Sequence, residues 1–209
     1  MKKSCFMMLK AIKEELVHHA PFTVLGAAAG VLFIYFAQGL SHSVSETIFY
    51  IFHPAHVFLS AYATGSMYQY RICTKFNHKC NPWVLLIVGL LGSIGIATIS
   101  DSFIPYWGES ILGMPHAEPH VGFVEAWWLV NPLALAGIAL AYFFPATKFP
   151  HTGHVLLSTF ASLFHMMMAV DGGLSFLMSF GIFFFLFLAV WLPCCLSDIV
   201  FPLLFIKKE

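Results

Sequence analysis

Two pairs of histidines carry the most distinctive chemistry in this sequence. The stretch HPAHVFLSAYA at 53–63 places His53 and His56 three residues apart at the head of an apolar run. Residues three apart share one face of a helix, so both imidazoles could bind a single metal ion. The HxxH pattern by itself is weak evidence, and its weight depends on what accompanies it.

The same pattern occurs a second time. Residues 151–161 read HTGHVLLSTFA, which brings His151 and His154 into the places of the first pair. Both stretches share the pattern H-x-x-H-V-x-L-S-x-x-A. A pattern of this length that recurs indicates an internal duplication much more strongly than either copy does alone.

A second motif follows each copy in the same order. S-D-x-x-x-P occurs at 100–105 and at 197–202, which places Asp101 and Asp198 in matching positions. The interval from the first histidine of a copy to its aspartate is 48 positions in the first half and 47 in the second. The near-identical spacing again predicts a duplicated unit.

These residue types favour a divalent transition metal. Imidazole and carboxylate suit Zn²⁺, Fe²⁺, Mn²⁺ or Ni²⁺ better than Cu⁺, which prefers sulfur ligands. We expect the four paired histidines to be ligands and the two aspartates to complete or neutralise the site. His165, on the same helix face as His154, is expected to be an auxiliary ligand or proton acceptor. The candidate metal residues are therefore His53, His56, Asp101, His151, His154, His165 and Asp198.

The composition predicts an all-α integral membrane protein. Apolar residues make up 59% of the chain and charged residues 10%, whereas soluble domains carry about 25% charge. The formal net charge of zero argues against nucleic-acid binding. Residues 1–20 mix lysines with apolar side chains, which predicts an amphipathic segment on the membrane surface.

Six membrane spans and their orientation follow from the apolar runs and the basic residues. Lysine and arginine fall only in connections that six spans would put on one side, which predicts cytoplasmic N- and C-termini. We expect a multi-pass protein of a prokaryotic plasma membrane. A homodimer is one expected assembly. The predicted spans are 22–40, 47–70, 83–101, 127–145, 152–171 and 173–192.

Three spans in each half would insert the second half upside down relative to the first. The expected units are a first repeat at 21–126, which includes an outer loop, and a second repeat at 127–209. Inverted repeats are the architecture of many secondary transporters, with the site near mid-membrane. Asp101 is expected at the outer end of its span, and Asp198 near mid-membrane if 193–206 forms a half-helix.

The outer connection and the cysteines carry weaker signals. Residues 102–126 hold acidic residues and histidines, which could collect cations at the outer mouth or be simply solvated; these are Glu109, His116, Glu118, His120 and Glu125. Cys73 and Cys80 match no zinc motif, so free thiols are expected. The serines of the two motifs, among them Ser60, Ser100 and Ser158, are possible partners of the site.

Three functions remain compatible with these patterns. The first is a transporter of a divalent metal ion, with uptake linked to pH because only neutral imidazole binds metal. The second is an intramembrane metalloenzyme, a zinc- or iron-dependent hydrolase or oxidase acting on a lipid-like substrate. The third is a haem-binding electron carrier with histidine axial ligands. A polar path across the membrane would favour the transporter, and an apolar groove leading to the site from the lipid would favour the enzyme.

Overall fold

The computed structural model describes residues 2–37, 39–70, 81–146, 148–170 and 174–195. These residues form helices and no strands, which confirms the all-α expectation for the described part of the chain. The helices are α1 (Lys2–Phe36), α2 (His42–Tyr68), α3 (Pro82–Leu90), α4 (Ile96–Thr98), α5 (Ile104–Ile111), α6 (Gly122–Glu125), α7 (Trp127–Phe143), α8 (Lys148–Ala169) and α9 (Phe176–Cys195).

α3, α4 and α5 are parts of one helical run of 30 residues from Pro82 to Ile111. Two π-helical turns, Leu91–Gly95 and Ile99–Phe103, join its three α-helical parts. We refer to the whole run as the bulged helix. The predicted end of this span at 101 is therefore wrong, and Asp101 lies inside the helix rather than at its outer end.

Hydroxyl side chains line the bulged helix where its backbone pattern changes. The Oγ of Ser93 donates to the carbonyl oxygen of Gly89 at 2.7 Å. The Oγ1 of Thr98 donates to the carbonyl of Ile94, also at 2.7 Å. Such bonds satisfy carbonyl groups that a π-helical turn leaves without their usual helical partner. Serine and threonine in an otherwise apolar helix thus stabilise its bulges.

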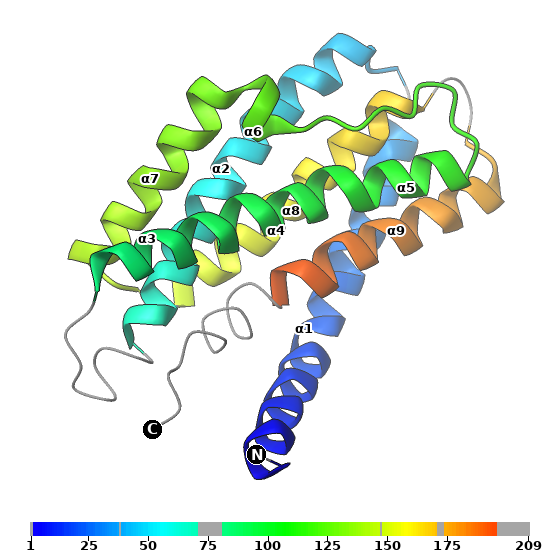
Figure 1. Ribbon diagram of the computed structural model, residues 1–209. Coiled ribbons are helices and arrows are strands. Elements are labelled where there is room, and N and C mark those ends of the chain that lie inside the picture. The colour runs from blue at the N-terminus through cyan, green and yellow to red at the C-terminus, as the bar shows by residue number, and fades with distance from the viewer. Residues whose placement is uncertain (1, 38, 71–80, 147, 171–173, 196–209) are drawn as a thin grey trace.

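α2 and α8 form the centre of the bundle (Figure 1). α7 and α3 pack on one side of this pair, and α1 and α9 pack against each other on the other side. α1 is a single helix across the predicted boundary at 20/21, although Pro21 lies inside it. Its N-terminal part projects beyond the bundle (Figure 1).

The two copies of the histidine motif lie in α2 and α8, and these helices run antiparallel. Phe49, before the first motif, contacts His165, which follows the second motif. Ten residues further along α2, Leu59 lies against Gly153, where an added Cβ would approach its Cδ1 to 2.6 Å. The contacted residue in α8 thus moves backwards as α2 advances. The two helices therefore contact each other near the middle of each motif.

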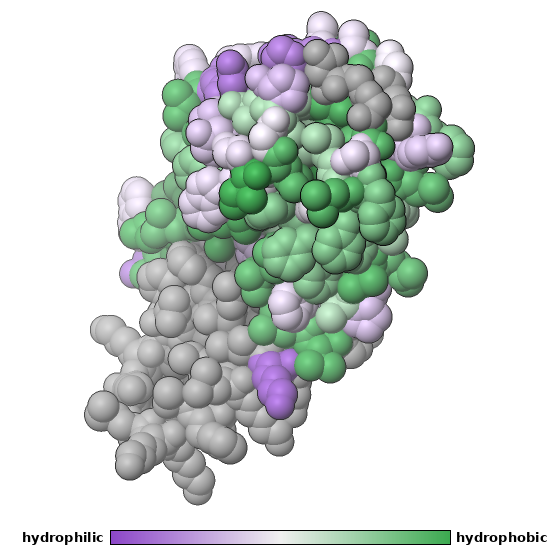
Figure 2. All heavy atoms as spheres, turned by 90° about the vertical axis from the view of Figure 1, so that its right-hand side faces the viewer, coloured by the Kyte–Doolittle hydropathy of each residue, from purple (hydrophilic) through white to green (hydrophobic). Residues whose placement is uncertain are grey.

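Within the described residues, three helices are long and apolar enough to cross a membrane. They are His19–Phe36 in α1, Pro82–Ile111 in the bulged helix, and Phe176–Cys194 in α9. Their outward faces expose large apolar side chains, and Figure 2 shows a broad hydrophobic surface on one side of the molecule with hydrophilic residues gathered at one end. The other three predicted spans fall on α2, α7 and α8. α7 is apolar but short, whereas the buried polar residues of α2 and α8 lower their hydropathy.

A glycine substitution tests the packing between α2 and α7. A Cβ at Gly137 would lie 2.4 Å from the carbonyl oxygen of Phe58 and 2.9 Å from the Cβ of Ala61. Because the first of these is a backbone atom, the helices must move apart. We expect Gly137→Ala to reduce the free energy of unfolding in detergent micelles by about 1–3 kcal/mol.

Gly95→Ala is the matched control, because a Cβ there meets nothing within 4 Å. Alanine is the better helix former, so we expect this variant to be as stable as the parent protein or slightly more stable. Equal destabilisation of both variants in a thermal unfolding series would contradict the close packing of α2 on α7.

Candidate functional site

A buried carboxylate joins the two histidines of the first motif. Asp101 and both imidazoles are fully enclosed. The Nδ1 atoms of His53 and His56 lie 2.9 Å and 2.7 Å from the same oxygen, Oδ2 of Asp101. The structure therefore brings together three of the seven predicted residues, two from α2 and one from the second π-helical turn.

The second oxygen of Asp101 accepts two hydroxyl groups. Ser100 donates to Oδ1 at 2.7 Å, and Ser158 from the second motif donates to it at 3.0 Å. Ser162 in α8 donates in turn to the carbonyl of Ser100 at 3.0 Å. Four donors from three helical segments thus compensate a charge that would be very unfavourable if it were buried alone.

This arrangement fixes the tautomers of the two imidazoles. An ionised carboxylate only accepts hydrogen bonds, so each Nδ1 carries a proton, and in the neutral form of each imidazole Nε2 presents a lone pair. Carboxylates orient metal-binding histidines in proteins in the same way. The Nε2 atoms nevertheless lie against different elements. That of His53 faces Gly122 in α6, where an added Cβ would approach it to 2.5 Å, and that of His56 lies 4.0 Å from the Sγ of Cys194 in α9.

A second buried carboxylate–imidazole pair lies towards the α6 end of the bundle. Nδ1 of His165 is 2.7 Å from Oε1 of Glu109, and both side chains are almost completely buried. The other oxygen, Oε2, has no hydrogen-bond partner among the described residues. On the opposite edge of His165, Nε2 is 3.4 Å from the backbone N–H of His120.

The predicted position of Glu109 in the outer connection at 102–126 is wrong. The bulged helix continues to Ile111, so Glu109 follows Asp101 by about two turns and faces the same interior. A carboxylate at helical spacing from Asp101 was the signal that could have found it.

Phe49 separates the two carboxylate–imidazole groups. Its ring stacks on His53 with centroids 5.2 Å apart and meets the ring of His165 edge-on at 5.4 Å. Phe49 itself is fully buried. The two groups are therefore neighbours without a direct polar contact.

Histidines continue from Asp101 towards the opposite end of the bundle. The ring centroids of His56 and His154 are 5.7 Å apart, and those of His154 and His151 are 5.2 Å apart. Beyond them, Nε2 of His151 lies 3.0 Å from Nε2 of His19 in α1. The second histidines of the two motifs thus face each other across the α2–α8 contact, while His53 and His151 point to opposite ends.

The α6 end of this arrangement reaches the surface at Glu125. The carboxylate of Glu125 accepts hydrogen bonds from the hydroxyl of Tyr50 and from the backbone N–H of Val121, the latter at 2.8 Å, and Oε2 lies 3.4 Å from Nδ1 of His120. Partial burial alone would raise the pKa of Glu125, but these hydrogen bonds outweigh burial and hold the pKa below its usual value.

Together these residues form one polar file through the bundle, interrupted only by the ring of Phe49. It begins at a half-exposed carboxylate beside α6 and ends at a histidine of α1. In order, its members are Glu125, His120, His165 with Glu109, His53, Asp101, His56, His154, His151 and His19. Asp198, the seventh predicted site residue, lies outside the described residues.

Among the described residues, no three His, Cys, Asp or Glu side chains are placed to hold one ion together. The file instead offers ligands singly and in pairs. α1 and α9 bring His19 and Cys194 to the file, and neither residue is among the predicted site residues.

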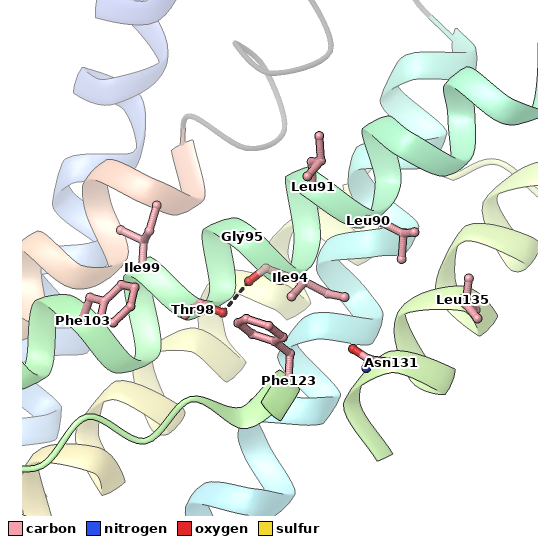
Figure 3. A pocket seen from close by; sticks show the side chains of 10 residues that line it. All are labelled: Leu90, Leu91, Ile94, Gly95, Thr98, Ile99, Phe103, Phe123, Asn131 and Leu135. Atoms are coloured by element: carbon pink, nitrogen blue, oxygen red, sulfur yellow. Dashed lines mark hydrogen bonds between the residues drawn. The ribbon is translucent and has the colours of Figure 1, made fainter. Parts of the chain in front are cut away.

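An apolar groove of about 630 Å³ lies on the other face of the bulged helix (Figure 3). Phe123 of α6 and Asn131 and Leu135 of α7 line its opposite wall. The part of the lining that comes from the bulged helix is Leu90, Leu91, Ile94, Gly95, Thr98, Ile99 and Phe103. No histidine or carboxylate lines it, so the groove does not open onto the polar file.

Comparison of the chain with protein-family models, with curated proteins and with solved structures gave no match.

Removing the Asp101 carboxylate should strongly destabilise the protein. Asp101→Ala leaves two buried imidazole N–H groups and two hydroxyl groups without their acceptor. We expect the free energy of unfolding in detergent to fall by about 3–5 kcal/mol. Ser100→Ala removes one donor only and should lose about 1 kcal/mol. An Asp101→Ala variant as stable as Ser100→Ala would show that the carboxylate does not hold this cluster together.

Glu125 should make the order of α6 depend on pH. Because the folded-state pKa lies below the ordinary value of 4.5, the stabilisation is present above that pH and is lost as the pH falls through the lowered value. Hydrogen exchange of the backbone amides at 121–126, corrected for intrinsic rates, should accelerate below about pH 4.5. In Glu125→Gln these amides should exchange faster already at about pH 6 and show no such acceleration. Identical pH profiles for both proteins would exclude this role.

Proposed function

We propose that the protein is a multi-pass membrane transporter of a divalent transition-metal ion. The observation that carries the proposal is the file of imidazoles and carboxylates that runs from Glu125 to His19 along the contact between α2 and α8. Ionisable groups inside a membrane are unfavourable and commonly mark ion pathways. Imidazole with carboxylate suits Zn²⁺, Fe²⁺, Mn²⁺ or Ni²⁺.

The residues of the file have different roles in this proposal. His53, His56, His151, His154 and His165 are ligands that the metal meets in succession, with water completing its coordination. Asp101 orients two of the imidazoles through Nδ1 and leaves Nε2 of each for the metal. It also balances part of the charge of the cation in a medium of low dielectric constant.

The proposed architecture is six spans in two inverted repeats with cytoplasmic termini. The antiparallel course of α2 and α8, which carry the two motif copies, supports it because inverted units must cross in this way. By the same repeat, Asp198 is expected to complete or neutralise the site together with Asp101. The histidines and serines in the middle of α2 and α8 are buried against the surrounding helices, which explains how polar spans are tolerated.

The groove bears on the alternative of a metalloenzyme with a lipid-like substrate. Such an enzyme needs a path from the lipid to its metal ligands. The groove is apolar and faces outward, but its lining contains none of the candidate ligands. A polar file through the bundle and a groove separated from it favour transport over catalysis.

Metal binding is the first part of the test. We expect the detergent-purified protein, loaded with Zn²⁺, Fe²⁺, Mn²⁺ or Ni²⁺, to retain at least one of them on elemental analysis. His53→Ala/His151→Ala should retain none while keeping its circular dichroism spectrum. Asp101→Asn should bind about 10- to 100-fold more weakly, because it no longer fixes both imidazoles. An absorbance spectrum of the same sample detects or excludes haem.

Metal flux is the second part. In liposomes with a trapped metal-sensitive dye, the parent protein should carry the retained ion across the bilayer, and His53→Ala/His151→Ala should not. His42→Gln is the matched control, because His42 is exposed and lies outside the file. Metal binding without flux would contradict transport and would indicate a metalloprotein with another function. Absence of binding for all four metals would overturn the metal site itself.

A further inference from the structure

We propose that the groove between the bulged helix and α7 binds one acyl chain of a membrane glycerophospholipid. This inference needs the bulged helix to lie in the bilayer, but it does not depend on which ion the protein carries or on whether it carries one. It rests on the shape and the lining of the groove and on the amide of Asn131.

The shape of the groove fits a single hydrocarbon chain. Its lining runs from Leu90 to Phe103, which is about 20 Å along a helix and slightly more than one leaflet of the hydrocarbon core. Gly95 provides room in the middle, because a Cβ there would meet nothing within 4 Å. Its volume of about 630 Å³ is within the range of small-molecule sites.

The lining is suited to an acyl chain rather than to a helix of a second copy. Helices that pack in membranes meet through small residues, whereas leucine, isoleucine and phenylalanine dominate this groove. The hydroxyl of Thr98 already donates to the carbonyl of Ile94, as Figure 3 shows, so it offers no donor to an occupant. Leu91 and Ile99 remain partly exposed at the rim, which makes the groove continuous with the lipid-facing surface.

Asn131 supplies a hydrogen-bonding group to the groove. It is the one amide in the lining and lies about one turn from Trp127 and Trp128, which are both 63% exposed. Exposed tryptophans mark the depth of the membrane interface, where the ester groups of lipids lie. The amide of Asn131, which Figure 3 shows on the Leu90 side of the groove, is therefore placed to donate to an ester carbonyl.

The groove also contacts two segments that enclose the carboxylate–histidine group, α6 and the second π-helical turn. Phe123 is adjacent in sequence to Gly122, which faces Nε2 of His53. Ile99 is in the same π-helical turn as Asp101. An acyl chain in the groove thus packs against both segments that enclose the carboxylate–histidine group. It makes the lipid a structural component of the site.

Photo-cross-linking tests the proposal. The full chain is reconstituted in nanodiscs of phosphatidylcholine that carries a diazirine on one acyl chain, irradiated, digested and mapped by mass spectrometry. We expect adducts at 90–103 and 123–135 to exceed those at 176–184 in α9 severalfold. Residues of α9 are the internal reference, because Phe176, Leu177 and Phe180 are more exposed than the groove residues and meet only bulk lipid in this arrangement.

Two variants fill the groove from opposite walls. Gly95→Trp and Leu135→Trp should each lower the groove adducts severalfold and leave those at 176–184 unchanged. Gly95→Ala, which adds one carbon, should behave like the parent protein. Using either wall keeps the test decisive if one variant fails to fold, as judged by circular dichroism.

Adducts distributed in proportion to exposure, or groove adducts that persist in both folded tryptophan variants, would overturn the proposal. Loss of groove adducts on competition with free fatty acid, but not with unlabelled phosphatidylcholine, would do the same, because it assigns the groove to another ligand. Each result is independent of metal binding, so a failure here is distinguishable from a failure of the proposed transport function.

Discussion

The buried carboxylate of Asp101 is the constraint on which the rest of the structure depends. A negative charge without solvent requires donors on every side, and it receives two imidazole N–H groups and two hydroxyl groups. These donors come from α2, from α8 and from the bulged helix itself. The position of the three central segments relative to one another is therefore determined by one side chain as much as by apolar packing.

The bulges of the helix that carries Asp101 follow from the same constraint. Ser100, Asp101 and Ser102 are consecutive and all buried, with partners in different elements: Ser158 for the carboxylate and the carbonyl of His120 for Ser102. A regular α-helix turns too far per residue to bury three neighbours equally, and a π-helical turn is wider. The irregular backbone is thus part of the construction of the site.

The sequence predicted the helical class and the association of His53 and His56 with Asp101. It did so because duplicated polar residues in an apolar chain are a strong signal. It failed at the end of the bulged helix, where Asp101 and Pro105 resembled the boundary of a span, and this error moved Glu109 into a loop. The roles of His19 and Cys194 could not be predicted, because they depend on how α1 and α9 cross the core. The two motifs do not converge on one cluster, because antiparallel helices carry their first histidines, His53 and His151, apart.

The antiparallel crossing of α2 and α8 at the middle of the two motifs has a consequence for the origin of such a fold. A single three-helix unit carrying H-x-x-H-V-x-L-S-x-x-A, inserted in both orientations, brings the second histidine of its motif against its own copy, as His56 and His154 lie here. An ancestral homodimer of opposed subunits would already possess the central contact. The two copies of the motif differ at their third position, which is Ala55 in the first copy and Gly153 in the second. Gly153, the smaller of these two residues, leaves room for the side chain of Leu59 in α2.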